Sequence, residues 1–179
     1  MITPENTQFV IIDIQGKLAE IVHESSILIK NARSMIQACH LLKIPIVLVE
    51  QNPKGLGSTH PLLAELLIEE TAIPKMSFSA FGEEAFRKNI EENQRKNILI
   101  AGIETHICVY QTAADLIENE YNVHLITDAV SSRTAENKKL GIEMIQNNGA
   151  KLTCTETAIF ELTKTCENPH FKSMLALIK

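Results

Sequence analysis

The stretch NILIAGIETHICVYQTAADL, residues 97–116, decides the fold class of this chain. It opens with an apolar run of the length and composition of a buried strand, and it ends with apolar residues at helical spacing. Gly102 marks the edge of the strand, and a short polar patch leads to Cys108 at the start of the helix. A buried strand that passes directly into a helix is the repeating unit of a parallel α/β sheet.

The same alternation extends through the rest of the chain. We expect strands over residues 8–15, 44–50, 71–76, 97–103, 122–130 and 150–155. We expect helices over residues 26–43, 60–70, 83–93, 107–119 and 135–148, with Gly149 at the C′ position of the last, and a terminal helix in NPHFKSMLALIK. The sequence therefore predicts an α/β fold in which helices cover both faces of a parallel sheet of about six strands.

Length and composition narrow the class of protein. A chain of 179 residues that is 45% apolar and 22% charged fits one ordered domain, residues 1–179. The net charge is −5 and no basic run is present, so we expect no nucleic acid partner. We also expect no signal peptide and no membrane contact, because no window approaches the roughly 20 apolar residues of a span. The four cysteines lack CxxC or metal-ligand spacing, which favours a reducing, cytoplasmic location.

Ligands of open parallel sheets lie beyond the carboxyl ends of the strands, so the residues there are the candidates for a site. Asp13 ends the first strand, where it either caps a turn or serves as an acid or base in a cleft. The third strand carries Lys75, which is either a surface residue or a member of the same site. Phe78 and Phe81 beside it are core residues or the apolar wall of a small-molecule pocket.

Cys108 is the third candidate. With Thr105 as N-cap, it would lie in the first helical turn, near N3, where free N–H groups and the helix dipole favour a thiolate and can hold an oxyanion. The alternative is a buried, inert cysteine. His106 does not face Cys108, because residues two apart diverge on a helix, and we interpret it as a residue of the pocket rim. No histidine spacing indicates a metal site.

At these residues the sequence resembles the isochorismatase-like cysteine hydrolases, which include nicotinamidases and N-carbamoylsarcosine amidohydrolases. The matching segments are VIIDIQ, VLVEQNPKGLG, PKMSFSAF, ILIAGIETHICVYQTAADL and VHLITDAVSSR, in the family's order over most of the chain. The EQNPKGLG segment is most similar to a small branch of the family without an assigned substrate. The resemblance implies a three-layer fold whose six-stranded parallel sheet has the order 3-2-1-4-5-6.

The resemblance also implies roles for individual residues. It implies a catalytic triad of Cys108 as nucleophile, Asp13 as base and Lys75 as electrostatic partner. It implies a non-proline cis peptide at Ile103–Glu104, which turns the Glu104 N–H toward an oxyanion beside the Cys108 N–H. VEQNPKGLGSTH stands where metal-binding nicotinamidases have an Asp-x-His motif, so we expect neither that metal nor any cofactor. Isochorismatases that cleave a vinyl ether commonly lack the cysteine, so Cys108 favours acyl transfer.

We therefore expect a hydrolase that cleaves a small amide, or a related carbonyl C–N bond, through a cysteine thioester. The pocket residues we expect are Gln51, Phe78, Phe81, Thr105 and His106. Two alternatives stay open: a non-catalytic small-molecule-binding or scaffold protein on the same fold, and a redox-sensing protein that uses a Cys108 thiolate. The family resemblance also favours a homo-oligomer, dimer or larger. The apolar tail SMLALIK either serves that interface or packs on its own sheet.

Overall fold

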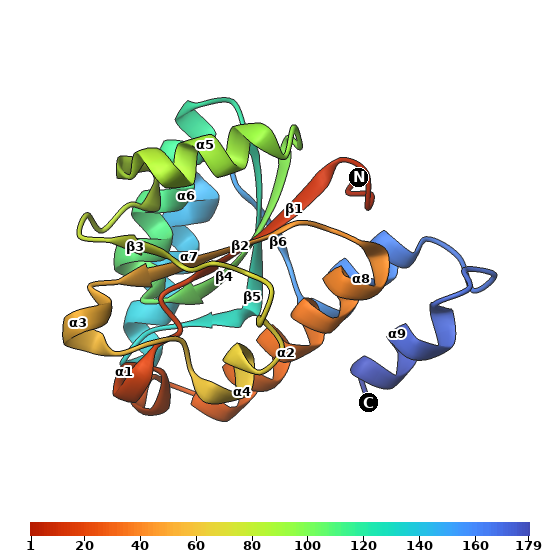
Figure 1. The fold of residues 1–179 in the computed structure, drawn as a ribbon, viewed down its shortest axis with the longest axis horizontal. Coiled ribbons are helices and arrows are strands. Elements are labelled where there is room, and N and C mark those ends of the chain that lie inside the picture. Colours follow the sequence, from red (N-terminus) through yellow and green to blue (C-terminus); the bar gives the residue numbers. More distant parts are fainter.

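A computed structural model describes residues 1–179 as a three-layer α/β fold built on one six-stranded, all-parallel sheet (Figure 1). The strand order is β3-β2-β1-β4-β5-β6, which confirms the order implied by the family resemblance. The strands are β1 (Thr7–Ile12), β2 (Ile46–Gln51), β3 (Ile73–Lys75), β4 (Asn97–Ile103), β5 (Asn122–Ser131) and β6 (Lys151–Thr153).

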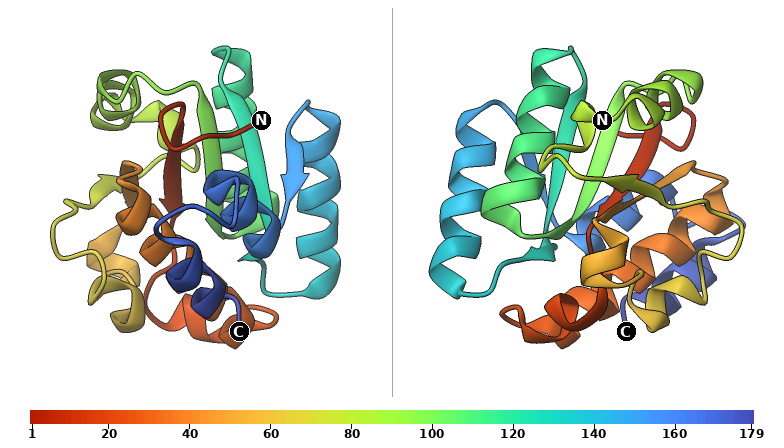
Figure 2. Two further views of the ribbon diagram at one scale, coloured as in Figure 1. Left: turned by 90° about the vertical axis from the view of Figure 1, so that its right-hand side faces the viewer. Right: turned by 60° about the vertical axis from the view of Figure 1, so that its left-hand side comes forward.

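Helices cover both faces of this sheet (Figure 2). They are α1 (Gly16–Ile21), α2 (Ser25–Leu42), α3 (Pro53–Leu56), α4 (Pro61–Ala64), α5 (Glu84–Glu92), α6 (Tyr110–Glu118), α7 (Ala135–Asn147), α8 (Thr155–Thr163) and α9 (Phe171–Leu177). Buried side chains of α5, α6 and α7 pack on one face, and those of α1, α2, α4, α8 and α9 pack on the other.

The two-sided cover explains why the strands have unbroken apolar runs. In β1, Phe9 and Ile11 join the core on the α2 side, whereas Val10 and Ile12 join the core on the α6 side. Successive side chains of a strand point to opposite faces, so a strand buried on both faces is apolar at every position. All six residues of β1 are buried.

Several helices differ from the expected ones. The helix expected over residues 60–70 ends at Ala64, and the chain continues in turns where the N–H groups of Leu66 and Leu67 bond carbonyls three residues back. The short helices α1 and α3 and the longer helix α8 were not predicted. The carboxylate of Asp128, at the end of β5, starts α8 by accepting hydrogen bonds from the Thr155 N–H and hydroxyl, at 2.8 and 2.9 Å.

The carboxyl-terminal tail packs on its own chain. Met174 of α9 is fully buried in the core on the α2 side, and the Leu177 carbonyl accepts a 2.8 Å hydrogen bond from the Ser34 hydroxyl of α2. This face of α9 is therefore covered by α2 and α8 rather than by the sheet itself, and the homo-oligomer stays a prediction. None of the helices is both long enough and apolar enough to cross a membrane.

The pairing of β1 with β4 sets the geometry at the carboxyl edge. Ile12 lies opposite Gly102, so Asp13 and Ile103 leave the sheet side by side. Gly102 has φ +154°, and a Cβ at this position would lie 2.5 Å from the Ile12 carbonyl oxygen. Only glycine permits so close an approach of the two strands. Asp13 itself has φ +56°, a left-handed conformation that is uncommon for residues other than glycine.

Candidate active site

Asp13 and Lys75 form a buried ion pair at this edge. Lys75 Nζ lies 2.8 Å from Asp13 Oδ2, and the two side chains are 0% and 3% exposed. The ammonium group also donates to Gln51 Oε1 at 2.5 Å, to the Ser77 carbonyl at 3.2 Å and to the Phe78 carbonyl at 2.9 Å. A buried ammonium needs this many acceptors, because its charge has lost its hydration.

Burial also governs the charge of Asp13. It raises the pKa of the Asp13 carboxyl above its ordinary value, while the charge and hydrogen bond of Lys75 oppose the rise. The hydrogen bond of Asp13 with the Cys108 thiol also lowers the pKa of Asp13, as Lys75 does. An acid whose pKa is moved toward neutrality by its surroundings is suited to accept and return a proton.

Cys108 lies in a π-helical turn, Thr105–Val109, that connects β4 to α6. Glu104, not Thr105, occupies the N-cap position, and the Thr105 hydroxyl is buried without a hydrogen-bond partner, so the expected cap was wrong. The turn rests on α7 at Gly141, where a Cβ would lie 2.6 Å from the His106 nitrogen and the Thr105 carbonyl carbon. The backbone of α7 therefore supports the turn that presents Cys108.

The thiol of Cys108 is protonated at neutral pH. Burial, followed by the negative charge of Asp13, raises the pKa of Cys108 to about 12, although Lys75 opposes the shift. We expected the helix end to favour a thiolate, but desolvation of a residue that is only 8% exposed outweighs that effect. A base beside the sulfur is consequently required before the sulfur can attack a carbonyl.

The peptide bond between Ile103 and Glu104 is cis. The buried Glu104 N–H donates to no acceptor in the chain. The N–H groups of Ile107 and Val109 both donate to the Glu104 carbonyl, at 3.0 and 3.2 Å, and the Cys108 N–H between them does not share this acceptor. The Glu104 side chain turns away to Arg133, whose backbone N–H and Nε donate to Glu104 Oε1 at 3.2 and 2.9 Å.

A cavity of about 150 Å³ opens onto the sulfur. Its wall consists of Asp13, Leu18, Gln51, Leu56, Phe78, Ile103, Glu104, Ile107 and Cys108. A cavity of this volume holds a molecule about the size of benzene. The arrangement thus places a thiol and a buried carboxyl group beside a space for a small molecule.

Comparison with known proteins identifies the family of the chain. A family model described as the isochorismatase domain matches residues 7–157. The chain belongs to the isochorismatase family. Isochorismatase family protein 1B of Dictyostelium discoideum is 36% identical over 182 residues, which cover 99% of this chain and 88% of the relative. The secreted isochorismatase effector Isc1 of Phytophthora sojae is 36% identical, covering 98% and 86% of the two chains.

Solved structures share the fold of this isochorismatase-family chain. A structure described as MAR1 ribonuclease from Caenorhabditis elegans superposes with a TM-score of 0.93 at 35% sequence identity, covering 99% of this chain and 91% of the other. The isochorismatase family is a family of hydrolases, and the likeness extends over the whole sheet and both helical layers.

The expected pocket residues of this family member divide into two groups. Gln51 and Phe78 line the cavity, whereas Phe81, Thr105 and His106 do not. Phe81 turns inward and packs edge-to-face on Phe86 of α5, with ring centroids 6.4 Å apart. Thr105 is fully buried, and His106 Nδ1 lies 2.9 Å from the Ser132 hydroxyl beyond β5.

Sequence reasoning missed the wall residues Leu18, Leu56 and Ile107. Ile107 directly precedes the cysteine, so its position in the turn could have indicated it. Leu18 and Leu56 come from separate connections that Gln15 holds together. Its side-chain amide donates to the Gln51 carbonyl at 3.1 Å and to the Gly57 carbonyl at 2.7 Å.

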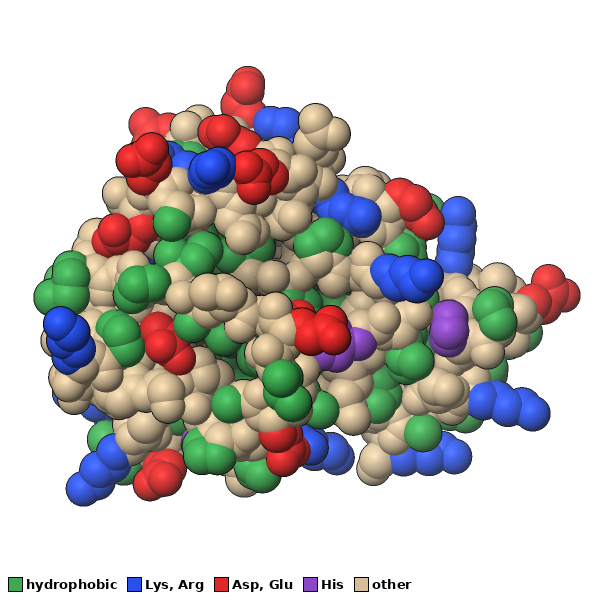
Figure 3. All heavy atoms as spheres, viewed as in Figure 1, with side chains coloured by type: hydrophobic (Ala, Val, Ile, Leu, Met, Phe, Trp, Pro, Cys, Tyr) green, Lys and Arg blue, Asp and Glu red, His purple; other side chains and the backbone are tan.

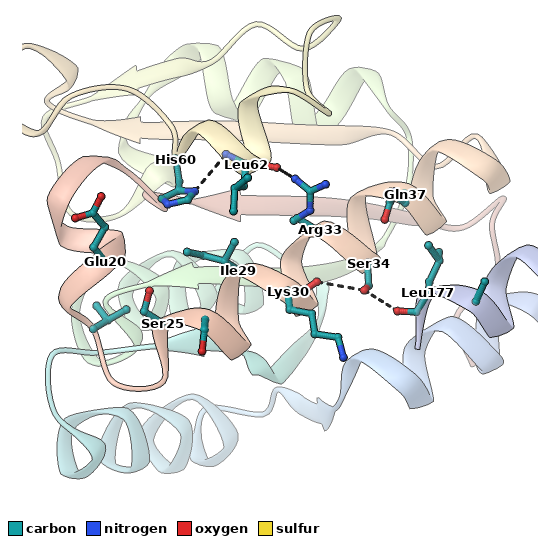
Figure 4. A pocket seen from close by; sticks show the side chains of 13 residues that line it. Glu20, Ser25, Ile29, Lys30, Arg33, Ser34, Gln37, His60, Leu62 and Leu177 are labelled. Carbon is teal, nitrogen blue, oxygen red and sulfur yellow. Dashed lines mark hydrogen bonds between the residues drawn. The ribbon is translucent and has the colours of Figure 1, made fainter. Parts of the chain in front are cut away.

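A larger, open pocket of about 1070 Å³ lies elsewhere, along α2 between α1, α4 and α9 (Figure 4). Three of its polar side chains have partners: the Ser34 hydroxyl donates to the Leu177 carbonyl, Arg33 pairs with Glu65, and His60 accepts from the Leu62 N–H. It contains no cysteine and no buried ion pair. The chemistry of the triad residues therefore belongs to the smaller cavity.

Proposed function

We propose that this protein hydrolyses a small amide, or a related carbonyl C–N bond, through a thioester on Cys108. The observation that carries the proposal is the buried Asp13–Lys75 ion pair placed against a protonated cysteine at the end of a small cavity. A thiol with a pKa of about 12 is a poor nucleophile at neutral pH unless a base removes its proton during attack.

In the first step the substrate carbonyl carbon sits near Cys108 Sγ. Asp13 accepts the thiol proton as the C–S bond forms, and the carbonyl oxygen takes up negative charge. The N–H groups of Glu104 and Cys108 stabilise this oxyanion, as the free Glu104 donor supports. Lys75 keeps Asp13 ionised before attack, because its charge lowers the pKa that burial raises.

In the second step the C–N bond breaks, and the protonated Asp13 gives its proton to the leaving amine. Water then attacks the thioester while Asp13 accepts a proton from it. Expulsion of the sulfur and return of that proton restore the thiol and release a carboxylic acid. One carboxyl group thus acts twice as base and twice as acid, and every proton is accounted for.

The test is a panel of small amides incubated with the wild type and with Cys108→Ser. Release of ammonia by the wild type alone is the expected result. Acid quenching during turnover, followed by peptide mass spectrometry, is expected to show the acyl group on Cys108 only. Asp13→Asn is the matched control, because it keeps the shape of the side chain and removes the base. Equal turnover in Cys108→Ser, or an acyl group on another cysteine, would refute the mechanism.

The likeness to a protein described as a ribonuclease makes RNA a second candidate substrate. On the face shown in Figure 3, basic side chains lie apart from one another and form no continuous stripe of the kind that binds RNA. Incubation of labelled single-stranded RNA with the wild type and with Cys108→Ser separates the two functions. Cleavage of RNA by the wild type without hydrolysis of any amide would replace the amide proposal.

The two non-hydrolytic alternatives make different demands on Cys108. A redox sensor uses a thiolate of low pKa, and burial raises the pKa of Cys108 instead. A binding or scaffold protein has no need for the ion pair beside the sulfur, which costs desolvation energy. Both observations favour the hydrolase.

A further inference from the structure

The cavity beside Cys108 has apolar walls apart from the groups of the proposed reaction. Hydrocarbon surface comes from four segments of the chain, through Leu18, Leu56, Phe78, and the pair Ile103 and Ile107. Apolar walls bind apolar parts of a ligand by displacing water from both surfaces.

The charges around the cavity are already balanced in pairs. Lys75 neutralises Asp13, and all four partners of its ammonium group belong to the protein. Arg133 neutralises Glu104 from outside the wall. A substrate carboxylate placed here would therefore find no free cation.

Neutral polar groups near the sulfur are also largely used. The Gln51 amide oxygen accepts from Lys75, and its nitrogen donates to the Met76 carbonyl at 3.1 Å, which leaves one N–H. Lys17 and Lys54 adjoin wall residues in the sequence, but both are exposed and neither lines the cavity. Beyond the N–H groups that the proposed reaction assigns to the oxyanion, one neutral donor remains, and it does not compensate the desolvation of a further full negative charge.

From these contacts we propose that the site selects small uncharged acyl compounds with a compact aliphatic group, of about six non-hydrogen atoms in all, and rejects carboxylates of the same size. The inference rests on the proposed function for the identity of the nucleophile and adds the substrate class. Isobutyramide is a representative member, and malonamate is its charged counterpart.

The experiment compares two electrophiles that differ in charge. Iodoacetamide and iodoacetate each transfer a two-carbon group to a cysteine sulfur, with loss of iodide and of the thiol proton. Exposed Cys166 of the same chain is the internal control. Peptide mass spectrometry gives the labelling rate at each cysteine. The ratio of the iodoacetamide rate to the iodoacetate rate is expected to be at least tenfold larger at Cys108 than at Cys166.

A pair of variants tests the missing cation directly. Leu56 is 39% exposed, so the protein tolerates a polar side chain there. Leu56→Lys is expected to lower the selectivity ratio at Cys108 at least fivefold, whereas the uncharged Leu56→Gln is expected to leave it within twofold of wild type. Isobutyramide is expected to slow labelling of Cys108 by iodoacetamide, and the same concentration of malonamate is not.

The outcomes separate this inference from the proposed function. Equal selectivity ratios at Cys108 and Cys166, or an unchanged ratio in Leu56→Lys, would overturn the inference while leaving a reactive Cys108 in place. Hydrolysis of malonamate in preference to isobutyramide would overturn it as well. Failure of both reagents to label Cys108 would contradict the nucleophile, and with it both proposals.

Discussion

Replacing Lys75 with methionine removes the positive charge from the buried pair while keeping most of the volume of the side chain. Asp13, whose side chain is 3% exposed, then loses its counter-charge. Breaking a buried ion pair by removing one partner costs about 3–5 kcal/mol, because the remaining charge stays desolvated. For a chain of this length, that loss lowers Tm by roughly 6–20 °C.

The loss depends on pH in a direction that the structure fixes. The pKa of Asp13 in the folded protein already lies above its ordinary value of 3.8, and removing Lys75 raises it further. A group with a raised folded pKa binds more protons in the folded state than in the unfolded state, so its contribution to stability falls as pH rises. The free energy of unfolding that Lys75→Met loses relative to wild type is therefore small at a pH near the pKa of Asp13 in the unfolded chain. This loss grows as the pH rises toward the raised pKa of Asp13 in the folded variant.

Urea unfolding of the wild type and variants at several values between about pH 4 and pH 8 measures this deficit. Asp13→Asn is expected to cost less, about 1–3 kcal/mol, since the ammonium keeps three acceptors in Gln51, Ser77 and Phe78. The double variant Asp13→Asn/Lys75→Met buries no charge at this point. Its cost is expected to fall below the sum of the single costs by about 1–3 kcal/mol.

Two results would refute this reasoning. One is a cost of Lys75→Met that does not change with pH, because the ionisation of Asp13 would then have no part in it. The other is strict additivity of the two single variants, which would mean that the two side chains stabilise the protein independently. Catalytic activity is not needed for either measurement, so the electrostatic argument is tested apart from the proposed reaction.

Three further changes test other parts of the structure. Gly141→Ala places a methyl group against the backbone of the turn that carries Cys108. We expect kcat to fall and the free energy of unfolding to decrease by about 1–3 kcal/mol; an unchanged kcat would contradict the contact. Arg133→Gln frees the Glu104 carboxylate, so kcat is expected to fall on the order of tenfold at constant KM, with unfolding free energy within about 0.5 kcal/mol of wild type; a change in stability alone would contradict this positioning role. Met174→Ala empties a fully buried position and is expected to cost about 2–5 kcal/mol and to speed proteolysis before α9; wild-type protease resistance would contradict the docking of the tail.

Local pattern was sufficient to predict the strands of the sheet, and the family resemblance supplied their order. Residues 97–103 were expected as a strand and form β4 with the same bounds. A short apolar run that is rich in β-branched residues and reaches a glycine favours a buried strand over other structures. The helix expected over residues 60–70 ends at Ala64. The apolar residues after Ala64 are compatible with turns as well as with a helix. Helix α8 depends on the Asp128 carboxylate from a distant strand, and no local pattern contains that contact.

The candidate site was predictable to the extent that it depends on strand ends. Asp13 follows β1, Lys75 ends β3 and Cys108 comes after β4, and all three were expected at one edge of one sheet. The parallel strands bring them there. Leu18 and Leu56 were not predictable, because the amide of Gln15 joins their two connections across the cavity. The protonated state of Cys108 depends on burial, which the position of a residue in a helix does not reveal.

The register between β1 and β4 joins the first half of the chain to the second at the reacting groups. Ile12 pairs with Gly102, and the carboxyl group and the cysteine turn that follow them are separated by more than half of the sequence. Neither half alone contains both Asp13 and Cys108. Under the proposed mechanism the reactivity of Cys108 therefore depends on the pairing of β1 with β4, and a change that opens this strand pair is expected to abolish that reactivity.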